Sequence, residues 1–461
     1  PAQRKFQHYR AQPNAAHTLS HSNVLPIFAS RREPKVLWLG TNNGLNRLDL
    51  TTGEYQHFFH QPTNEAKGPA GNYILSLLED RRGDLWIGTR GSGLSRMTHD
   101  RKGNPHFTHF RHDPLDATTL GSNAVHSIYE DRAGVIWLGT GGGGLNRFDA
   151  ARGAFKRYEM SATAPFGLRD SFVYAMLEDS RGEFWLGTSS GGLHHFDRRR
   201  ETFTQFAHAP NDAQSLSNNR VLCLFESARD SSLWIGTAAG LNKLLRHGEK
   251  IRFQQFRERE GLPNEVIYGI LEDHAGRLWV STNRGICRLQ LENEKLRVRA
   301  FTVEDGLQSN EFSQNAYHRG PAGEMFFGGI NGFNAFHPDS VRDHPRPPAV
   351  VITDFKILNH SVTMASGRLQ QSLAATQSLA LTYKDLFFSI EFAALNFTLP
   401  EKNQYAYMME GSDADWIHSG ARRFVTYTNL APGAYTFRVR AGNHDGVWNE
   451  AGATLQILIT P

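Results

Sequence analysis

The sequence predicts an all-β protein that consists of a seven-bladed β-propeller followed by an immunoglobulin-like β-sandwich. A phrase of the type Leu-Trp-Leu-Gly-Thr recurs about every 45 to 51 residues, and each period also holds short segments with alternating apolar residues. The period stops near residue 348, where a different spacing of apolar segments begins. Repeats of this length with β character are typical of propeller blades. The central aromatic residues of the seven copies are Trp38, Trp86, Trp137, Trp185, Trp234, Trp279 and Phe326.

The third copy shows how one period divides into strands. Alternating apolar residues at 125–131, 135–140, 145–149 and 155–158 are separated by turns that contain glycine or aspartate. This pattern is typical of hairpins, and four antiparallel strands in one period form a propeller blade. The tryptophan of each copy is then expected in the blade core.

The two ends of the repeat region predict how the ring closes. The chain begins with a strand-like segment, residues 6–9, that has no blade before it. The seventh copy has three strands, at 313–318, 325–329 and 332–336, and then runs into prolines without a fourth. Pairing the first segment with the last blade removes exposed strand edges. We therefore expect one-plus-three closure and a propeller that spans residues 1–344.

The turns and loops of the repeat differ in character. Short turns with the sequence Glu-Asp-x-x-Gly recur at 79–83, 130–134, 178–182 and 272–276. Their aspartates are expected to cap their own backbone rather than bind calcium. The loops that follow each Gly-Thr vary, and they lie on the opposite face in this topology. That face is the expected recognition surface.

The remaining segment, residues 345–461, has the size and strand rhythm of an immunoglobulin-like sandwich. Its tyrosines are expected to be structural, because a buried phenol combines an apolar ring with one hydrogen bond. The expected strands are 350–358, 379–383, 387–392, 405–410, 423–427 and 434–441, and the tyrosines are Tyr405, Tyr407, Tyr427 and Tyr435.

Composition excludes several function classes. The chain of 461 residues has 50 basic and 46 acidic residues, a net charge of +4, which gives no footprint for nucleic acid. Its two cysteines, Cys223 and Cys287, exclude a disulfide scaffold and are expected to be buried thiols. The 21 histidines lack metal-ligand spacing, so we expect no metal and no cofactor. Residues 187–191 spell a nucleophile elbow but fall in a repeat loop, so we expect no catalytic residue.

Candidate binding residues lie at the starts of the first strands and in the variable loops, around the predicted channel mouth. Amide, guanidinium and aromatic groups suit sugar hydroxyls and ring faces. The candidates are Asn72, Arg90, Asn123, His126, Phe172, Tyr174, Arg220, Glu265, Tyr268, Asn283, Arg284, Glu311 and Asn331.

The repeat unit Glu-Asp-x-x-Gly-x-x-Trp-Leu-Gly-Thr-x-x-Gly-Leu resembles the two-component regulator propeller repeat, and residues 301–312 with 326–336 resemble the final blade of that family. Residues 350–461 resemble its three-tyrosine (Y_Y_Y) domain, notably at 405–411, Trp416 and 427–437. The resemblance implies the periplasmic sensor region of a one-span bacterial receptor. It further implies a homodimer through the sandwich, a membrane helix after Pro461, and a histidine kinase or diguanylate cyclase beyond it. Relatives often carry two propellers, so a further propeller before Pro1 stays open.

Three functions remain open at this point. The favoured one is sensing of a small solute such as an oligosaccharide, which the sandwich relays to a cytoplasmic output domain. The alternative is a protein-interaction scaffold in the cell envelope. A propeller lyase or glycosidase that uses Glu265 or Glu311 is less favoured, because the sequence shows only scattered acidic groups near the mouth.

Overall fold

A computed structural model describes residues 5–12, 15, 17–248, 250–292, 295–341, 347–364, 368–369, 371–382, 384–385, 387–396, 400–443 and 446–461. The chain divides into two compact units, Pro1–Val341 and Arg342–Pro461. The predicted boundary after residue 344 falls outside the described residues. Among those residues there is no α-helix, and no helix is long and apolar enough to cross a membrane. Short 3-10 helices cover Glu65–Lys67, Glu258–Glu260, Val303–Asp305, Pro338–Ser340, Leu373–Ala375 and Pro400–Lys402.

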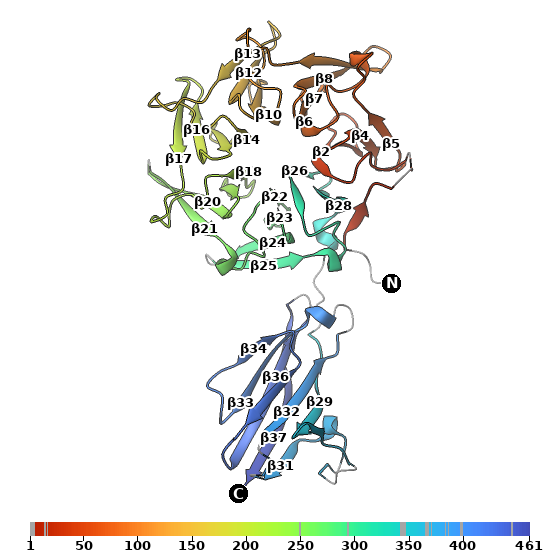
Figure 1. Cartoon of the computed structure of the whole chain (residues 1–461), viewed down its shortest axis with the longest axis vertical. Coiled ribbons are helices and arrows are strands. Elements are labelled where there is room, and N and C mark those ends of the chain that lie inside the picture. The colour runs from red at the N-terminus through yellow and green to blue at the C-terminus, as the bar shows by residue number, and fades with distance from the viewer. Residues whose placement is uncertain are drawn as a thin grey trace. The chain divides into compact units, whose positions relative to one another are not determined.

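In its described part, the first unit holds seven four-stranded antiparallel sheets, which are arranged around a ring as blades 1 to 7 (Figure 1). Blades 1 to 3 contain β2 Val24–Ala29, β3 Val36–Thr41, β4 Gly44–Asp49, β5 Tyr55–Phe58; β6 Ile74–Glu79, β7 Leu85–Thr89, β8 Leu94–His99, β9 Pro105–Phe110; and β10 Val125–Glu130, β11 Ile136–Thr140, β12 Leu145–Asp149, β13 Ala154–Tyr158. Blades 4 to 6 contain β14 Val173–Glu178, β15 Phe184–Thr188, β16 Leu193–Asp197, β17 Thr202–Phe206; β18 Val221–Glu226, β19 Leu233–Thr237, β20 Gly240–His247, β21 Lys250–Phe256; and β22 Gly269–Glu272, β23 Leu278–Thr282, β24 Gly285–Glu292, β25 Lys295–Phe301.

Blade 7 is built from both ends of the unit. Its strands are β26 Phe312–Arg319, β27 Met325–Gly329, β28 Gly332–Phe336 and the N-terminal β1 Gln7–Tyr9. β1 pairs antiparallel with β28, and the Phe6 ring packs edge-on against Phe301 and Phe336 at 5.3 and 4.9 Å. The innermost strand β26 contacts both β22 and β2, its neighbours around the ring. This is the pairing that the unpartnered first strand and the three-stranded last repeat lead us to expect.

The recurring tryptophans lie in the blade core, as predicted, with exposures of 0 to 5%. Trp137 shows why the phrase repeats: its Nε1–H donates to Asp131 Oδ2 at 2.9 Å, while Asp131 Oδ1 accepts the Val135 N–H. The preceding residue, Glu130, accepts the N–H of Arg81 from blade 2. The Glu-Asp pair therefore closes its own turn and ties it to the blade before it, which confirms the structural interpretation of these aspartates. The same indole bond occurs at Trp86, Trp185 and Trp279.

The second unit is a sandwich of two sheets, in the orders β30-β29-β32-β35 and β31-β37-β36-β33-β34 (Figure 1). Tyr405, Tyr407 and Tyr427 are buried in its core, as the structural interpretation predicts. The strands are β29 Val350–Ile357, β30 His360–Ser361, β31 Ser378–Thr382, β32 Phe387–Ala394, β33 Gln404–Glu410, β34 Ile417–Gly420, β35 Phe424–Thr428, β36 Gly433–Gly442 and β37 Trp448–Thr460.

The sequence-based strand list for this unit was incomplete. It lacked β30, β34 and the long last strand β37. β37 pairs antiparallel with β36 and parallel with β31, and it buries Leu455, Ile457 and Ile459 on one face. Its alternation of apolar and polar residues was readable as a strand. Tyr383, at the end of one predicted strand, lies outside the described residues.

Candidate functional site at the mouth of the ring

The starts of the innermost strands bring many of the predicted residues together. In blades 1 to 6 a buried aliphatic residue, such as Val125 or Val173, stands at the start of the innermost strand, and its side chain enters the core; Phe312 takes this place in blade 7. Side chains alternate along a strand, so the next residue, His126 or Tyr174, points away from that core. The repeat therefore places one variable side chain per blade at the same end of the ring.

Arg90 and His126 form the first part of this arrangement, on blades 2 and 3. The Arg90 guanidinium lies over the ring of Tyr73, 4.9 Å from its centroid. Burial lowers the pKa of His126 to about 4, and the positive charge of Arg90 adds to that shift. His126 is therefore a neutral imidazole near pH 7, able to donate one hydrogen bond and accept another.

Blades 4 and 5 continue the arrangement with aromatic residues and a second arginine. The His126 ring meets Tyr174 edge-on at 5.1 Å and lies 6.3 Å from Phe172. Phe172 is 40% exposed, which is unusual for a phenylalanine and leaves its ring available at the surface. The exposed Arg220 lies 5.9 Å from the centroid of Tyr174.

Blades 6 and 7 complete the arrangement at the ring mouth with the phenol of Tyr268, the amide of Asn283 and the carboxylate of Glu311. Burial raises the pKa of Tyr268, a side-chain hydrogen bond with Asn283 lowers it, and the charges of Glu311 and Arg220 act on it in opposite directions. Tyr268 therefore stays a neutral phenol between an anion and a cation. We call the set formed by Arg90, His126, Phe172, Tyr174, Arg220, Tyr268, Asn283 and Glu311 the mouth arc.

A bulge in β26 reaches across the ring beside the mouth arc. Phe312 pairs with Gly329 and the next registered pair is Tyr317 with Phe327, so the residues between them leave the ladder. Asn315 adopts a positive φ of 62° and donates Nδ2–H to the carbonyl oxygen of His126 at 2.9 Å. The bulge thus spans the ring from blade 7 to blade 3. Further amide contacts run from Asn315 to Leu75 O and from Gln314 to Leu222 O, both at 3.4 Å.

The other predicted residues serve the repeat itself or stand apart from the mouth arc. Asn72 Oδ1 accepts the His60 N–H, and its carbonyl accepts the Gly44 N–H of the preceding blade. Asn123 makes the matching bonds to His112 and Gly93, and Glu265 occupies the same position opposite Gly240. Asn331 binds Gln308 and accepts from His8, which joins the last blade to β1. Arg284 is exposed, and its backbone N–H donates to Thr282.

Three residues of this region were not singled out from the sequence: Tyr73, Gln314 and Asn315. Tyr73 precedes Ile74 as Phe172 precedes Val173, so alignment of the repeats was sufficient to find it. The bulge also left a signal, because Phe312 precedes Phe326 by 14 residues whereas Val125 precedes Trp137 by 12. The extra residues of the seventh copy belong to its first strand, but their path across the ring depends on tertiary contacts.

Comparison with known proteins agrees with this architecture. Residues 68–91, 119–142, 167–190 and 261–284 match the family described as two component regulator propeller, and residues 396–460 match the Y_Y_Y domain. Histidine kinase P4 from Formosa agariphila is 36% identical over 157 residues, which are 34% of this chain and 11% of that protein. The chain therefore spans a small part of this curated relative.

Solved structures extend the likeness to the whole chain. The extracellular domain of a hybrid two component system from B. thetaiotaomicron aligns with a TM-score of 0.79 and 26% identity, over 100% of this chain and 58% of that one. A virginiamycin B lyase from Staphylococcus aureus, crystallised with quinupristin, shares the propeller fold at a TM-score of 0.50 and 16% identity, over 72% of this chain and 98% of that one. The chain thus matches the two component regulator propeller in four segments and the Y_Y_Y domain in one, and as a whole it is similar to the extracellular domain of a hybrid two component system.

Proposed function

We propose that the chain is the periplasmic solute-sensing region of a membrane-anchored signalling receptor, and that the mouth arc binds a polar solute such as an oligosaccharide. The observation that carries this proposal is the convergence of the arc residues. Side chains from six blades, far apart in sequence, meet at one end of the ring through Arg90, His126, Tyr174, Arg220, Tyr268 and Glu311.

The chemistry of the mouth arc supports a neutral, hydroxyl-rich ligand. Phe172 and Tyr174 offer ring faces for the apolar side of a sugar, and arginine, amide and phenol groups offer hydrogen bonds in several directions. Both charge signs occur, with Arg220 and Glu311 acting on the same phenol. A strongly charged ligand therefore gains less here than a neutral one with many hydroxyls.

Signalling by the receptor requires only that the solute binds two arrangements of the receptor with different affinity. We propose a homodimer through the sandwich unit, whose two arrangements bind the solute with different strength. A ligand shifts such an equilibrium by no more than its differential affinity for the two states. The kinase or cyclase that receives the signal belongs to the parent receptor and is part of this proposal.

The direct test is calorimetric titration of the chain with a panel of neutral oligosaccharides, followed by Arg220→Ala. We expect one member of the panel to bind, and the variant to weaken that binding at least about tenfold, since the loss of a hydrogen bond to a charged group costs roughly 1.5–3 kcal/mol. Arg152→Ala is the matched control, because Arg152 is 83% exposed on an outer turn. Binding that survives Arg220→Ala unchanged contradicts the assignment.

Two other outcomes would change the functional class. Turnover of a bound polysaccharide that is lost on Glu311→Gln favours the lyase or glycosidase alternative. Capture of a defined envelope protein by the same face, with no response to any solute, favours the interaction scaffold.

A further inference from the structure

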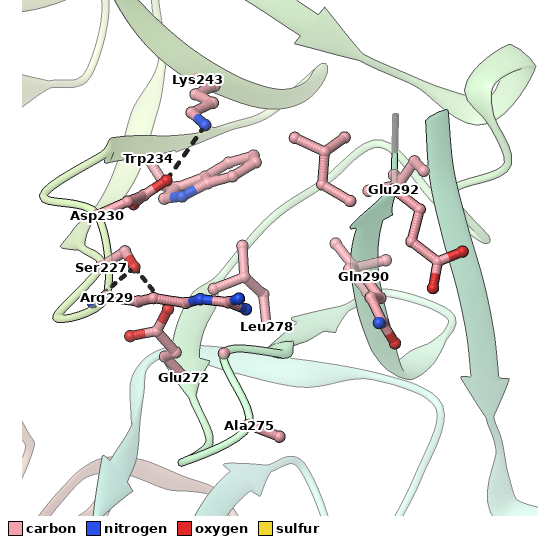
Figure 2. Close-up of a pocket in the computed structure, with 14 residues that line it drawn as sticks. Ser227, Arg229, Asp230, Trp234, Lys243, Glu272, Ala275, Leu278, Gln290 and Glu292 are labelled. Carbon is pink, nitrogen blue, oxygen red and sulfur yellow. Dashed lines mark hydrogen bonds and ion pairs between the residues drawn. The ribbon is translucent and has the colours of Figure 1, made fainter. Parts of the chain in front are cut away.

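A pocket of about 500 Å³ lies between blades 5 and 6, at the end of the strands opposite the mouth arc. The turn that follows β18 forms one side, through Ser227, Arg229 and Asp230, and the last residue of β22, Glu272, lies on the other (Figure 2). Part of the wall is apolar and consists of Leu278, Leu289, Leu291 and Leu296. This volume lies in the range of pockets that hold small organic ligands.

The indole N–H of Trp234 is an unused donor in this pocket. Trp234 is 5% exposed and lines the pocket. In blades 2, 3, 4 and 6 the corresponding N–H donates to an aspartate, but in blade 5 the aspartate position is Ser227, whose hydroxyl donates to Glu272 Oε1 at 2.6 Å. Among the described residues, no acceptor is bonded to Trp234 Nε1. A ligand in the pocket that carries a hydrogen-bond acceptor can therefore bond to this N–H.

The interface between blades 5 and 6 also lacks the arginine that lies between blades 3 and 4. Between blades 3 and 4, Arg198 fills the corresponding space and pairs with Asp131 Oδ2 at 3.0 Å and Glu178 Oε1 at 2.6 Å. Arg198 follows Leu193 by five residues, and the residue that follows Ile286 by five in blade 6 is Leu291. Leu193 and Ile286 hold matching places in their sheets, paired with Gly187 and Ser281. The pocket between blades 5 and 6 therefore lies in the space that the Arg198–Asp131 ion pair occupies between blades 3 and 4.

The pocket between blades 5 and 6 still holds an acidic and a basic side chain, Glu272 and Arg229. Glu272 corresponds to Glu178 and keeps its carboxylate at the pocket, where it accepts from Ser227 and from the Ala228 N–H. The Arg229 guanidinium extends along the pocket and has no acidic partner among the described residues (Figure 2). Lys243 and Asp230, 3.5 Å apart, form a pair of their own at the edge, and Glu292 stands on the opposite side (Figure 2).

In blade 1 a serine also stands in place of the aspartate, and a pocket lies beside the tryptophan of that blade. Ser30 holds the aspartate position there and donates to Glu79 at 2.6 Å, just as Ser227 does to Glu272. Trp38 of that blade lines a pocket of about 440 Å³. Its wall, however, holds Arg32, Arg47 and Glu33 in place of the leucines. The apolar wall is thus what distinguishes the pocket between blades 5 and 6.

We propose that this pocket binds an α-amino acid with an apolar side chain. The ligand carboxylate replaces the missing aspartate and accepts from Trp234 Nε1 and Arg229. The ammonium group replaces the missing guanidinium and donates to Glu272, and the side chain lies on Leu278, Leu289 and Leu296. The site would give the chain a second ligand, bound at the opposite end of the blades from the solute of the mouth arc, and it does not depend on that proposal.

The test is calorimetric titration of the whole chain with L-phenylalanine and L-leucine, beside N-acetyl-L-phenylalanine and L-phenylalanine amide. We expect saturable binding of at least one free amino acid, and at least about tenfold weaker binding when either charge is removed, since each charged hydrogen bond contributes roughly 1.5–3 kcal/mol. Equal binding of the acetylated and free forms, or no binding of either amino acid, overturns the proposal.

Variants copied from the neighbouring blades give the sharpest comparison. Ser227→Asp combined with Leu291→Arg restores the ion pair of blades 3 and 4, and we expect it to abolish binding. Ser30→Asp makes the same serine change in blade 1 and should leave binding unchanged, as should Arg220→Ala at the mouth arc. Trp234→Phe keeps the ring and removes the donor, so it tests the site even if the double variant fails to fold. Binding that persists unchanged in Trp234→Phe, or in a folded double variant, contradicts the assignment.

Discussion

Asn315 donates its side-chain N–H to the carbonyl oxygen of His126 at 2.9 Å, although the two residues lie on β26 and β10, which are not neighbours in the ring. The bond holds the bulge of blade 7 against the far side of the propeller. It fixes the backbone of His126, a member of the mouth arc, and it depends on a residue with a positive φ. Asparagine tolerates that conformation better than most residues and also supplies the donor.

Replacement of Asn315 should separate these two contributions. Asn315→Gly keeps the backbone conformation and removes the amide, so we expect a loss of about 1–2 kcal/mol of unfolding free energy. Asn315→Ala removes the same amide and also disfavours the positive φ, which adds about 1 kcal/mol. Urea unfolding of both variants measures the difference. Equal stability of the alanine variant and the wild type would show that the bond contributes nothing.

The aspartate–tryptophan bond should behave as a coupled pair. Asp131 is 2% exposed, and it binds both Trp137 and Arg198. Asp131→Ser, the substitution that blade 5 carries naturally, leaves both donors without that carboxylate, and we expect a cost of about 3 kcal/mol or more. In a double-mutant cycle with Trp137→Phe, the two losses should fall short of additivity by about 1–2 kcal/mol. Additive losses would mean that the indole bond is not formed in solution.

Which structural features could be predicted from the sequence depends on the interactions that determine each of them. The Trp phrase recurs because every blade needs the same buried ring and the same aspartate bond, so periodicity was enough to predict the blades. The predicted binding residues fall into two groups. His126 and Tyr174 lie in the mouth arc, whereas Asn72 and Asn123 form hydrogen bonds with the backbone of adjacent blades. Both kinds are polar residues near a strand start, but the asparagine recurs two residues before the buried aliphatic residue, again at Asn219, and makes the same bond there. Alignment of the repeats was therefore sufficient to separate the two kinds, whereas the contacts among the mouth arc residues depend on tertiary structure.

His194 should make stability depend on pH. It is fully buried, its Nε2 accepts the Arg169 N–H at 3.3 Å, and its Nδ1 has no hydrogen-bond partner within the described part. Burial lowers its pKa to about 4, with Asp170 raising and Arg169 lowering the value to a smaller extent. The unfolded state, with a pKa near 6.5, therefore gains its proton first as pH falls. Folding stability should decrease between about pH 6.5 and pH 4.

His194→Asn tests this dependence with a residue that the repeat itself uses. Asn146 holds the same register in blade 3 and accepts the Gly121 N–H at 2.8 Å, as His194 accepts from Arg169. We expect the variant to fold and to lose less stability on acidification, by up to about 3 kcal/mol at pH 4. Chemical denaturation at pH 7 and pH 4 measures this difference. Parallel pH profiles for the two proteins would contradict the lowered pKa.

Closure of the ring should depend on Phe6, which is 1% exposed and packs against Phe301 and Phe336 from two different blades. Phe6→Ala removes a buried aromatic ring at the point where β1 joins blade 7, and we expect a cost of about 3–5 kcal/mol. Tyr9→Ala, on β1 itself but partly exposed, serves as the comparison and should cost less. Thermal unfolding gives the order of the two variants, and the reverse order would argue against closure through this strand.

The most direct test of the central claim is hydrogen exchange of the chain with and without a bound oligosaccharide from the panel. The account predicts slower exchange at the starts of β6, β10, β14, β18 and β22 and in the loops that carry Arg90 and Asn283, with little change at the turns on the opposite end of the blades. Protection confined to those opposite turns, or to the sandwich unit, would contradict binding at the mouth arc.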